Sequence, residues 1–297
     1  MTLSIGFLGL GGMGRPMAEC LLRAGLPLAI RSGNPETARE FAAMGAQVVP
    51  TPAALAEAAG LVFSCLPDHG VLDALVFGPD GLAAQDWPGG LLVDCSTIAP
   101  QEAQDMARRL AGRGAAFLDA PVSGGRKGAA EGTLTAMVGG AEADLARARP
   151  ALGAMAARIF HIGPVGAGQT TKACNQIMVA VNLMGAFEAI GLARAGGVDV
   201  ARMREVVLTG TGRSAALEAI VPRYLEGAEA VGFRLEQMLK DIAIATDAGR
   251  AAGQHQPGAE AVREMLAGAA AAGLGARDLA ALGLRYDALN GDAFAED

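Results

Sequence analysis

The first half of the chain alternates short apolar runs with alanine-rich segments of helical spacing. The apolar runs stand at residues 3–8, 28–30, 48–49, 61–65, 91–95, 116–118, 135–138 and 159–162. Between several of them, apolar residues recur with the period of a helix at residues 13–23, 36–44, 52–58, 101–113 and 142–155. Strands that alternate with helices predict a mostly parallel sheet with helices on both faces, in which the last strands could run antiparallel.

The pattern changes after the glycine-rich segment that follows residue 163. From there to residue 290 almost every segment has helical spacing, with expected helices at 168–196, 199–209, 214–225, 235–252, 258–272 and 277–289. We therefore expect two domains, an α/β domain over residues 1–163 and an all-α domain over residues 164–297.

A glycine-rich motif directly follows the first apolar strand and opens the first helix. It consists of Gly9, Leu10, Gly11, Gly12, Met13 and Gly14. The GxGxxG pattern alone is weak evidence in a chain with 42 glycines. Between a strand and a helix, however, it is typical of a Rossmann domain, where glycines allow a tight turn and the helix N-terminus faces a pyrophosphate. The motif predicts a dinucleotide cofactor.

The residues after the second strand indicate which dinucleotide is bound. NAD sites usually place a carboxylate there, whereas NADP sites favour an arginine beside the 2′-phosphate. The chain has Arg31 and Ser32 at this point, and its first acid is Glu36. We expect NADP, with NAD as the alternative, because Arg31 could also be an ordinary surface residue.

Three further segments are expected where strands leave the carboxyl edge of the sheet, which is where ligands bind in such folds. Leu66 and Pro67 follow one strand and Thr97 follows the next, so these residues are expected to border the cofactor or to form simple turns. Ser123, Gly124 and Gly125 follow a later strand. A hydroxyl beside glycine N–H groups suits a small carboxylate, and a flexible loop is the alternative.

Lysine is rare in this chain, and one lysine stands in a motif with chemical potential. Of 24 basic residues only Lys127, Lys172 and Lys240 are lysines. A buried lysine can exchange a proton, whereas an arginine stays protonated. Lys172 follows a glycine-rich turn, and Asn175 comes three residues later on the same helix face. This predicts an acid–base group at Lys172, weighed against an ordinary solvated lysine at a helix start.

The amino-acid composition argues against several classes of protein and of binding site. A formal charge of −7 and a pI near 5.1, with no basic cluster, argue against a nucleic-acid partner. Four cysteines without CxxC spacing, and three scattered histidines, predict neither a metal site nor a disulfide framework. The start of the chain shows no signal-peptide pattern, and residues 177–190, interrupted by Asn182 and Glu188, predict a buried helix rather than a membrane span. We expect a cytoplasmic protein.

Taken together, these segments resemble the β-hydroxyacid dehydrogenase family, which includes 3-hydroxyisobutyrate dehydrogenase and tartronate semialdehyde reductase. The resemblance covers nearly the whole chain and rests on five motifs in order: residues 9–17 (GLGGMGRPM), 94–100 (DCSTIAP), 119–140 (DAPVSGGRKGAAEGTLTAMVGG), 166–175 (GAGQTTKACN) and 239–241 (LKD). It implies a Rossmann domain, a helical domain that helps to form a homo-oligomer (dimer or tetramer), and an active site in the cleft between them.

The resemblance also implies roles for single residues. Lys172 matches the catalytic lysine, Asn175 its neighbour that holds the substrate, and Lys240 the lysine that closes over the cofactor. Ser123, Gly124 and Gly125 match the cradle of the substrate carboxylate. The residues after the second strand depart from the family, which often has Asn-Arg-Thr or an aspartate there, so cofactor preference does not transfer. Arg126 and Lys127 replace smaller residues and are expected to face water.

These expectations lead to one reaction and two alternatives. A hydride would pass between NADP(H) and a small 3-hydroxy acid or its semialdehyde, with Lys172 as general acid or base. An imine reductase shares this fold, but such enzymes generally lack the lysine at position 172. A catalytically silent nucleotide-binding protein is the alternative outside enzymes, and Lys172, Asn175 and Ser123 argue against it.

Overall fold

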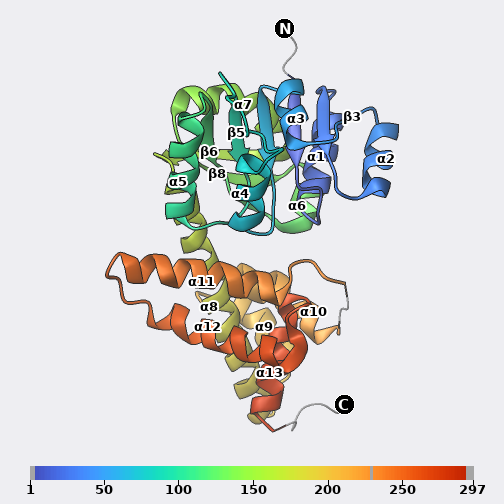
Figure 1. The fold of residues 1–297 in the computed structure, drawn as a ribbon. Helices are drawn as coiled ribbons and strands as arrows, with labels where there is room; N and C mark the ends of the chain where they lie inside the picture. Colours follow the sequence, from blue (N-terminus) through green and yellow to red (C-terminus); the bar gives the residue numbers. More distant parts are fainter. Residues whose placement is uncertain (1–3, 228–229, 292–297) are drawn as a thin grey trace. The chain divides into compact units, whose positions relative to one another are not determined.

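The computed structural model describes residues 4–227 and 230–291, and their contacts divide the chain into the units Met1–Lys172 and Ala173–Asp297 (Figure 1). The strands of the first unit end at Gly163, and helix α8 (Ala167–Ala195) begins in the first unit and continues into the second. The domain boundary after residue 163 remains a prediction.

The first unit is built on one mostly parallel sheet. Its order in space is β3-β2-β1-β4-β5-β6-β8-β7, with β9 paired to β8. The strands are β1 (Ile5–Leu8), β2 (Leu28–Arg31), β3 (Gln47–Val48), β4 (Leu61–Ser64), β5 (Leu91–Asp94), β6 (Ala116–Asp119), β7 (Val122–Ser123), β8 (Leu134–Gly139) and β9 (Ala156–Gly163). Strands β1 to β6 pair in parallel, whereas β8 runs antiparallel to β6 and β7. The predicted sheet and its late antiparallel strands are confirmed.

Helices cover both faces of this sheet because its buried strands alternate their side chains between two apolar clusters. The helices are α1 (Gly14–Arg23), α2 (Pro35–Ala43), α3 (Pro52–Ala58), α4 (His69–Phe77), α5 (Pro100–Ala111), α6 (Gly125–Glu131) and α7 (Glu142–Met155). One cluster contains buried residues of α1, α2, α6 and α7, and the other contains those of α3, α4 and α5. On β1, for example, Phe7 belongs to the first cluster and Leu8 to the second.

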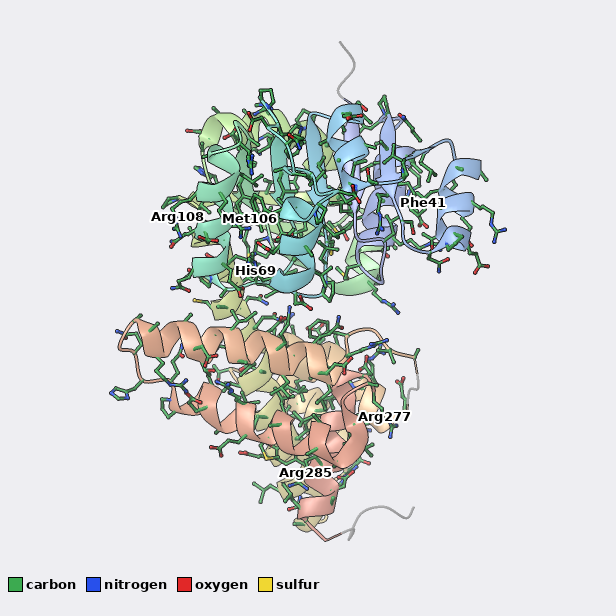
Figure 2. The ribbon with its side chains drawn as sticks, in the orientation of Figure 1. Phe41, His69, Met106, Arg108, Arg277 and Arg285 are labelled. Atoms are coloured by element: carbon green, nitrogen blue, oxygen red, sulfur yellow. The ribbon has the colours of Figure 1, made fainter. Side chains whose placement is uncertain are left out.

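Helix α5 is amphipathic, as its sequence period predicts. On α5, Met106 is fully buried while the side chain of Arg108 is 69% exposed (Figure 2). Asn34, Thr51 and Asp68 cap the starts of α2, α3 and α4 by accepting a backbone N–H. Capping helps to fix where these three helices begin, and therefore where the loops that precede them end.

The second unit is helical throughout its described residues, apart from an isolated bridge between Arg234 and Asp278. After α8 its elements are α9 (Val200–Thr209), a π-helical turn (Ala216–Ile220), α10 (Val221–Leu225), α11 (Leu235–Ala251), α12 (Pro257–Ala269), a second π-helical turn (Ala270–Leu274), a 3-10 turn (Leu279–Ala281) and α13 (Leu282–Leu289). Its core gathers one face of α8 with apolar residues of α11, α12 and α13.

Helix α8 is the described helix whose length and composition would allow it to cross a membrane, a criterion that core helices of soluble proteins also meet. Leu183, Phe187 and Ile190 are buried in the core of the helical unit. Met178 and Leu192 on the same helix are 61% and 77% exposed. The prediction of a buried helix therefore holds for one face of α8 and is wrong for the other.

Candidate active site

The glycine-rich turn lies between β1 and α1, at the point where the strand order reverses. Strands β2 and β3 lie to one side of β1, and β4 and the later strands lie to the other, so the carboxyl edge at β1 and β4 is the expected ligand position. Gly9 has φ +89, and a β carbon there would lie 2.8 Å from Leu66 Cδ2. A β carbon on Gly14 would collide with the carbonyl oxygen of Gly9. Only glycine fits these two positions.

The same turn leaves room for a phosphate group. A β carbon on Gly11 would meet nothing within 4 Å. The first turn of α1 carries no acidic residue, and its N-cap residue, Met13, makes no side-chain cap hydrogen bond. Backbone N–H groups at a helix start, without a competing carboxylate, suit a pyrophosphate. These features fit a dinucleotide cofactor at Gly9–Gly14.

Arg31 is the last residue of β2, beside this turn. The Nε atom of its guanidinium is buried and has no hydrogen-bond partner among the described residues. The hydroxyl of the next residue, Ser32, is already hydrogen-bonded. Its Oγ lies 3.1 Å from both the backbone nitrogen and the carbonyl oxygen of Asn34. A buried polar atom without a partner is costly, and a phosphate oxygen would satisfy it.

Arg126 lies on α6 and is exposed, as expected for a residue that faces water. Its side chain nevertheless reaches the glycine-rich turn, because a β carbon on Gly12 would lie 2.9 Å from the Nε atom of Arg126. The sequence pattern did not predict this proximity. It places a second guanidinium beside the candidate pyrophosphate position.

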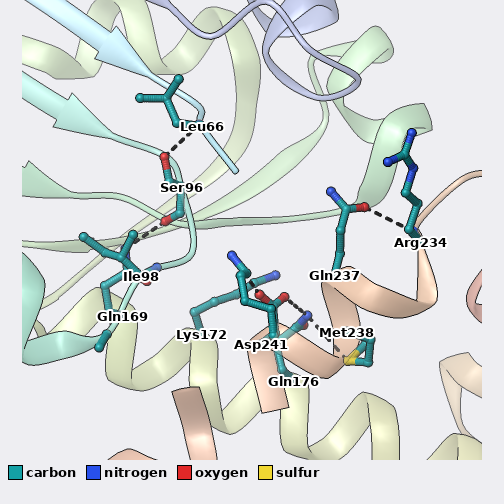
Figure 3. A network of polar contacts seen from close by, with 12 residues as sticks. Leu66, Ser96, Ile98, Gln169, Lys172, Gln176, Arg234, Gln237, Met238 and Asp241 are labelled. Atoms are coloured by element: carbon teal, nitrogen blue, oxygen red, sulfur yellow. Dashed lines mark hydrogen bonds and ion pairs between the residues drawn. The ribbon is translucent and has the colours of Figure 1, made fainter. Parts of the chain in front are cut away.

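The loops after β4 and β5 are joined by hydrogen bonds at the same edge of the sheet. The backbone N–H of Leu66 donates to Ser96 Oγ at 2.8 Å (Figure 3). Ser96 Oγ in turn donates to Asp94 Oδ1 at 2.6 Å. Ser64 Oγ donates to the same carboxylate oxygen at 2.7 Å. Pro67 is exposed and Thr97 is partly exposed. The network thus holds both loops predicted to border the cofactor.

Lys172 is buried, with 8% of its surface exposed. Its Nζ donates to the carbonyl oxygen of Val122 at 2.9 Å. Val122 directly precedes Ser123, which ends β7, and Gly124 and Gly125 follow with φ +129 and +63. The structure therefore brings the predicted acid–base group and the predicted carboxylate cradle together within the first unit.

The N-terminus of α8 is attached to the sheet through Asp119. Asp119 Oδ1 accepts the N–H of Gly166 and Oδ2 accepts that of Gln169, both at 2.8 Å. Burial raises the pKa of Asp119, although these N–H groups act in the opposite direction. Lys172 lies three residues beyond Gln169, so Asp119 helps to set the position of the lysine's backbone.

The other two predicted site residues on helices, Asn175 and Lys240, belong to the second unit. Asn175 Nδ2 donates to Gln176 Oε1 at 2.8 Å. Gln176 Nε2 donates to Asp241 Oδ2 at 2.7 Å (Figure 3). Lys240 Nζ forms an ion pair with Asp241 Oδ1 at 3.3 Å. Asn175 and Lys240 are therefore linked through Gln176 and the buried carboxylate of Asp241.

Sequence reasoning did not assign roles to Asp94, Asp119, Gln169 or Asp241, which carry these networks. One feature of the sequence could have indicated them: they are polar residues at the ends of buried strands or on apolar helices, where a buried polar group needs a hydrogen-bond partner. Among the described residues no group of three or more His, Cys, Asp or Glu side chains could hold a metal ion.

Comparisons with known proteins agree with the fold and the motifs. Residues 4–163 match the family model described as the NAD binding domain of 6-phosphogluconate dehydrogenase. Residues 166–285 match the model described as NAD-binding of NADP-dependent 3-hydroxyisobutyrate dehydrogenase. The two models together cover almost all of the chain.

Individual relatives are similar over most of their length. The 2-(hydroxymethyl)glutarate dehydrogenase of Eubacterium barkeri is 34% identical, over 95% of this chain and 94% of its own. The NAD-dependent L-serine dehydrogenase of Pseudomonas aeruginosa is 40% identical, over 85% of this chain and 87% of its own. The solved 3-hydroxyisobutyrate dehydrogenase of Mycobacterium tuberculosis is 36% identical with a TM-score of 0.86, over 96% of this chain and 99% of that chain.

Imine reductases, the alternative within enzymes, are more distant. A solved imine reductase from Pseudomonas sp. is 20% identical with a TM-score of 0.62, over 96% of this chain and 99% of that chain, and this likeness shows the fold alone. The family models, the relatives and the expected fold lead to one assignment. The chain belongs to the β-hydroxyacid dehydrogenase family of NAD(P)-dependent enzymes.

Proposed function

We propose that this enzyme transfers a hydride between NADP(H) and a small 3-hydroxy acid or its semialdehyde, with Lys172 as the general acid or base. The observation that carries the proposal is the 2.9 Å hydrogen bond from the buried Lys172 Nζ to Val122 O, beside Ser123. A proton donor and a carboxylate-binding turn in such proximity suit a substrate whose reacting carbon lies close to a carboxylate.

The cofactor supplies or accepts the hydride, and the residues of the chain handle the proton and the charge. During reduction, the Lys172 ammonium donates a proton to the oxygen of the carbonyl group as negative charge develops there. During oxidation, the neutral amine accepts the hydroxyl proton. The Ser123 hydroxyl and the N–H groups of Gly124 and Gly125 bind the carboxylate, which orients the substrate.

We propose NADP as the preferred cofactor and NAD as the weaker one. The residues that support this are Arg31, with its buried and unpartnered Nε, and Arg126 beside Gly12. An arginine binds a phosphate through charge-assisted hydrogen bonds, and no carboxylate stands at the end of β2 to bind ribose hydroxyls.

We also propose that the enzyme is a homo-oligomer that buries the exposed face of α8. Met178, Gly185 and Leu192 are seven residues apart, so they lie along one side of the helix. The two large side chains are exposed, and a β carbon on Gly185 would meet nothing within 4 Å. A long apolar stripe with a small residue at its centre favours close packing against another helix.

A spectrophotometric panel tests the reaction. The enzyme is assayed with NADPH and with NADH against small semialdehyde carboxylates, the matching aldehydes without a carboxylate, and cyclic imines. Turnover of the semialdehyde carboxylates, much above that of the other two classes, is the expected result. Preferred turnover of the imines would support the imine reductase instead, and no oxidation of either cofactor would indicate a silent nucleotide-binding protein.

A further inference from the structure

Gln169 is a buried glutamine whose side chain contacts only backbone groups of another segment. It stands in the first turn of α8, three residues before Lys172, and is 1% exposed. Its Nε2 donates to Ser96 O at 2.8 Å, and its Oε1 accepts the N–H of Ile98 at 3.3 Å (Figure 3). One carboxamide therefore binds the peptide groups on both sides of Thr97.

The backbone of Gln169 is held just as firmly as its side chain. Its N–H donates to Asp119 Oδ2 at 2.8 Å. The preceding residue, Gly168, packs closely against the backbone of the sheet. A β carbon on Gly168 would lie 2.8 Å from the carbonyl oxygen of Asp119 and would collide with that of Met137. The start of α8 thus rests directly on the ends of β6 and β8, where it has little freedom to move.

The segment on the other side of Gln169 is also anchored. Ser96, whose carbonyl accepts from Gln169, uses its hydroxyl to contact Asp94 at 2.6 Å and the N–H of Leu66 at 2.8 Å. The loops after β4 and β5 and the start of α8 consequently form a single hydrogen-bonded unit. The side chain of Gln169 connects these loops to the helix.

We infer that Gln169 is a positioning residue for hydride and proton transfer, and that it sets the distance between the cofactor loop at Thr97 and the amine of Lys172. The inference rests on the proposed function, which gives Thr97 and Lys172 their roles. Transfer between two groups requires their separation to be correct within a fraction of an ångström, and a displacement of about 1 Å can reduce the rate about 100-fold. A residue that touches neither substrate nor cofactor can therefore control the rate.

The test compares Gln169→Met with Gln104→Met. Methionine has a similar length but neither donates nor accepts the two hydrogen bonds in the same way. Gln104 is an exposed glutamine on α5 whose Nε2 lies 3.4 Å from Val165 O, so it serves as a matched control. For each variant we would measure kcat, KM, the Kd of NADPH and the deuterium isotope effect with NADPH labelled at the transferred position.

The expected result for Gln169→Met is a fall in kcat of about 10- to 100-fold. The Kd of NADPH should change much less than kcat, and the isotope effect on kcat should rise because hydride transfer becomes rate-limiting. Gln104→Met should match the wild type. A purely structural role would instead lower activity in proportion to the unfolded fraction and leave the isotope effect unchanged, and that result would overturn the inference.

Two further measurements keep the test decisive. If Gln169→Met does not fold, Gln169→Glu is used, because it has the same shape and retains the acceptor for the Ile98 N–H while losing the donor to Ser96. Hydrogen–deuterium exchange needs no activity, and the amide of Ile98 should exchange faster in Gln169→Met than in the wild type. Unchanged exchange there would refute the anchoring role even if Lys172 proves catalytic. Normal turnover in a Lys172 variant would refute the proposed function, and with it the role of Gln169 in proton transfer, while faster exchange at Ile98 would still show the anchoring.

Discussion

The side-chain amine of Lys172 lies 2.9 Å from the carbonyl oxygen of Val122, the residue that precedes Ser123. These residues are 50 positions apart in the chain, and α8 and β7 bring them together. The contact holds a buried amine next to the segment Ser123–Gly125, the predicted carboxylate cradle. This arrangement is the basis of the first prediction.

Replacing Lys172 with alanine should lower kcat by at least about 100-fold, which is typical of the loss of a general acid or base. Binding of NADPH, measured by fluorescence titration, should be retained, because the glycine-rich turn is unaffected. Lys127→Ala is the matched control, since Lys127 is an exposed lysine of the same unit and should leave kcat unchanged. Near-normal turnover in Lys172→Ala would rule out the proposed acid–base role.

Replacing Arg31 with alanine should change cofactor preference. Loss of a charge-assisted contact to the 2′-phosphate would reduce the ratio of kcat/KM for NADPH to that for NADH by about 10- to 100-fold. The exposed Arg39 on α2 provides the control, and Arg39→Ala should keep the wild-type ratio. An unchanged ratio in Arg31→Ala would show that the buried Nε atom serves another purpose.

The carboxylate of Asp94 should make the enzyme less stable as pH rises from acidic towards neutral values. Burial raises its pKa above the ordinary value of 3.8, against hydrogen bonds from Ser96 and Ser64 that lower it. Between the ordinary pKa and the raised one, the folded protein binds more protons than the unfolded chain, so the free energy of unfolding falls with increasing pH. Above the folded pKa this loss is complete.

Asp94→Asn removes this titration and tests its sign. The difference in Tm, variant minus wild type, should increase as pH rises above 3.8, the ordinary pKa, and become constant above the folded pKa. Thermal denaturation across a buffer series measures the trend. A difference that decreases with pH would contradict the assigned direction.

The exposed stripe on α8 should control assembly. Introducing aspartate at Met178 and Leu192 would place charges in the proposed interface, where an unpaired buried charge is strongly unfavourable. Sedimentation velocity should show a smaller species than the wild type. Leu289→Asp is the control, because Leu289 on α13 is 54% exposed and lies outside the stripe. A wild type that sediments as a monomer would end this proposal.

Most elements of the fold could be predicted because the spacing of apolar residues along the sequence reflects which side chains are buried. The expected strands at 61–65 and 91–95 correspond to β4 and β5, and the helix expected at 142–155 is α7. Helix α4 was not predicted, because its sequence, HGVLDALVF, is apolar around most of its circumference and lacks a clear helical period. Strand β7 has two residues and is defined only by its pairing with β8, which no local pattern reveals.

The site residues that stand in a sequence motif could be predicted. The residues whose hydrogen bonds hold them in place could not. Lys172 and Ser123 stand in recognisable segments, and the structure brings them together. Gln169 and Asp119 act through partners about 50 to 70 positions away, at Ser96, Ile98 and Gly166, and such pairings depend on tertiary structure. Arg126 likewise gives no local sign that its side chain reaches Gly12.

The contacts of the chain separate its two units directly after Lys172, so this residue is grouped with the sheet that carries the glycine-rich turn. A chimaera that keeps residues 1–172 and takes its C-terminal half from a related enzyme would retain Lys172, its partner Val122 and the glycine turn after Ser123. Asn175 and Lys240 would be exchanged instead. We expect such a chimaera to accept different molecules and to keep the proposed reaction.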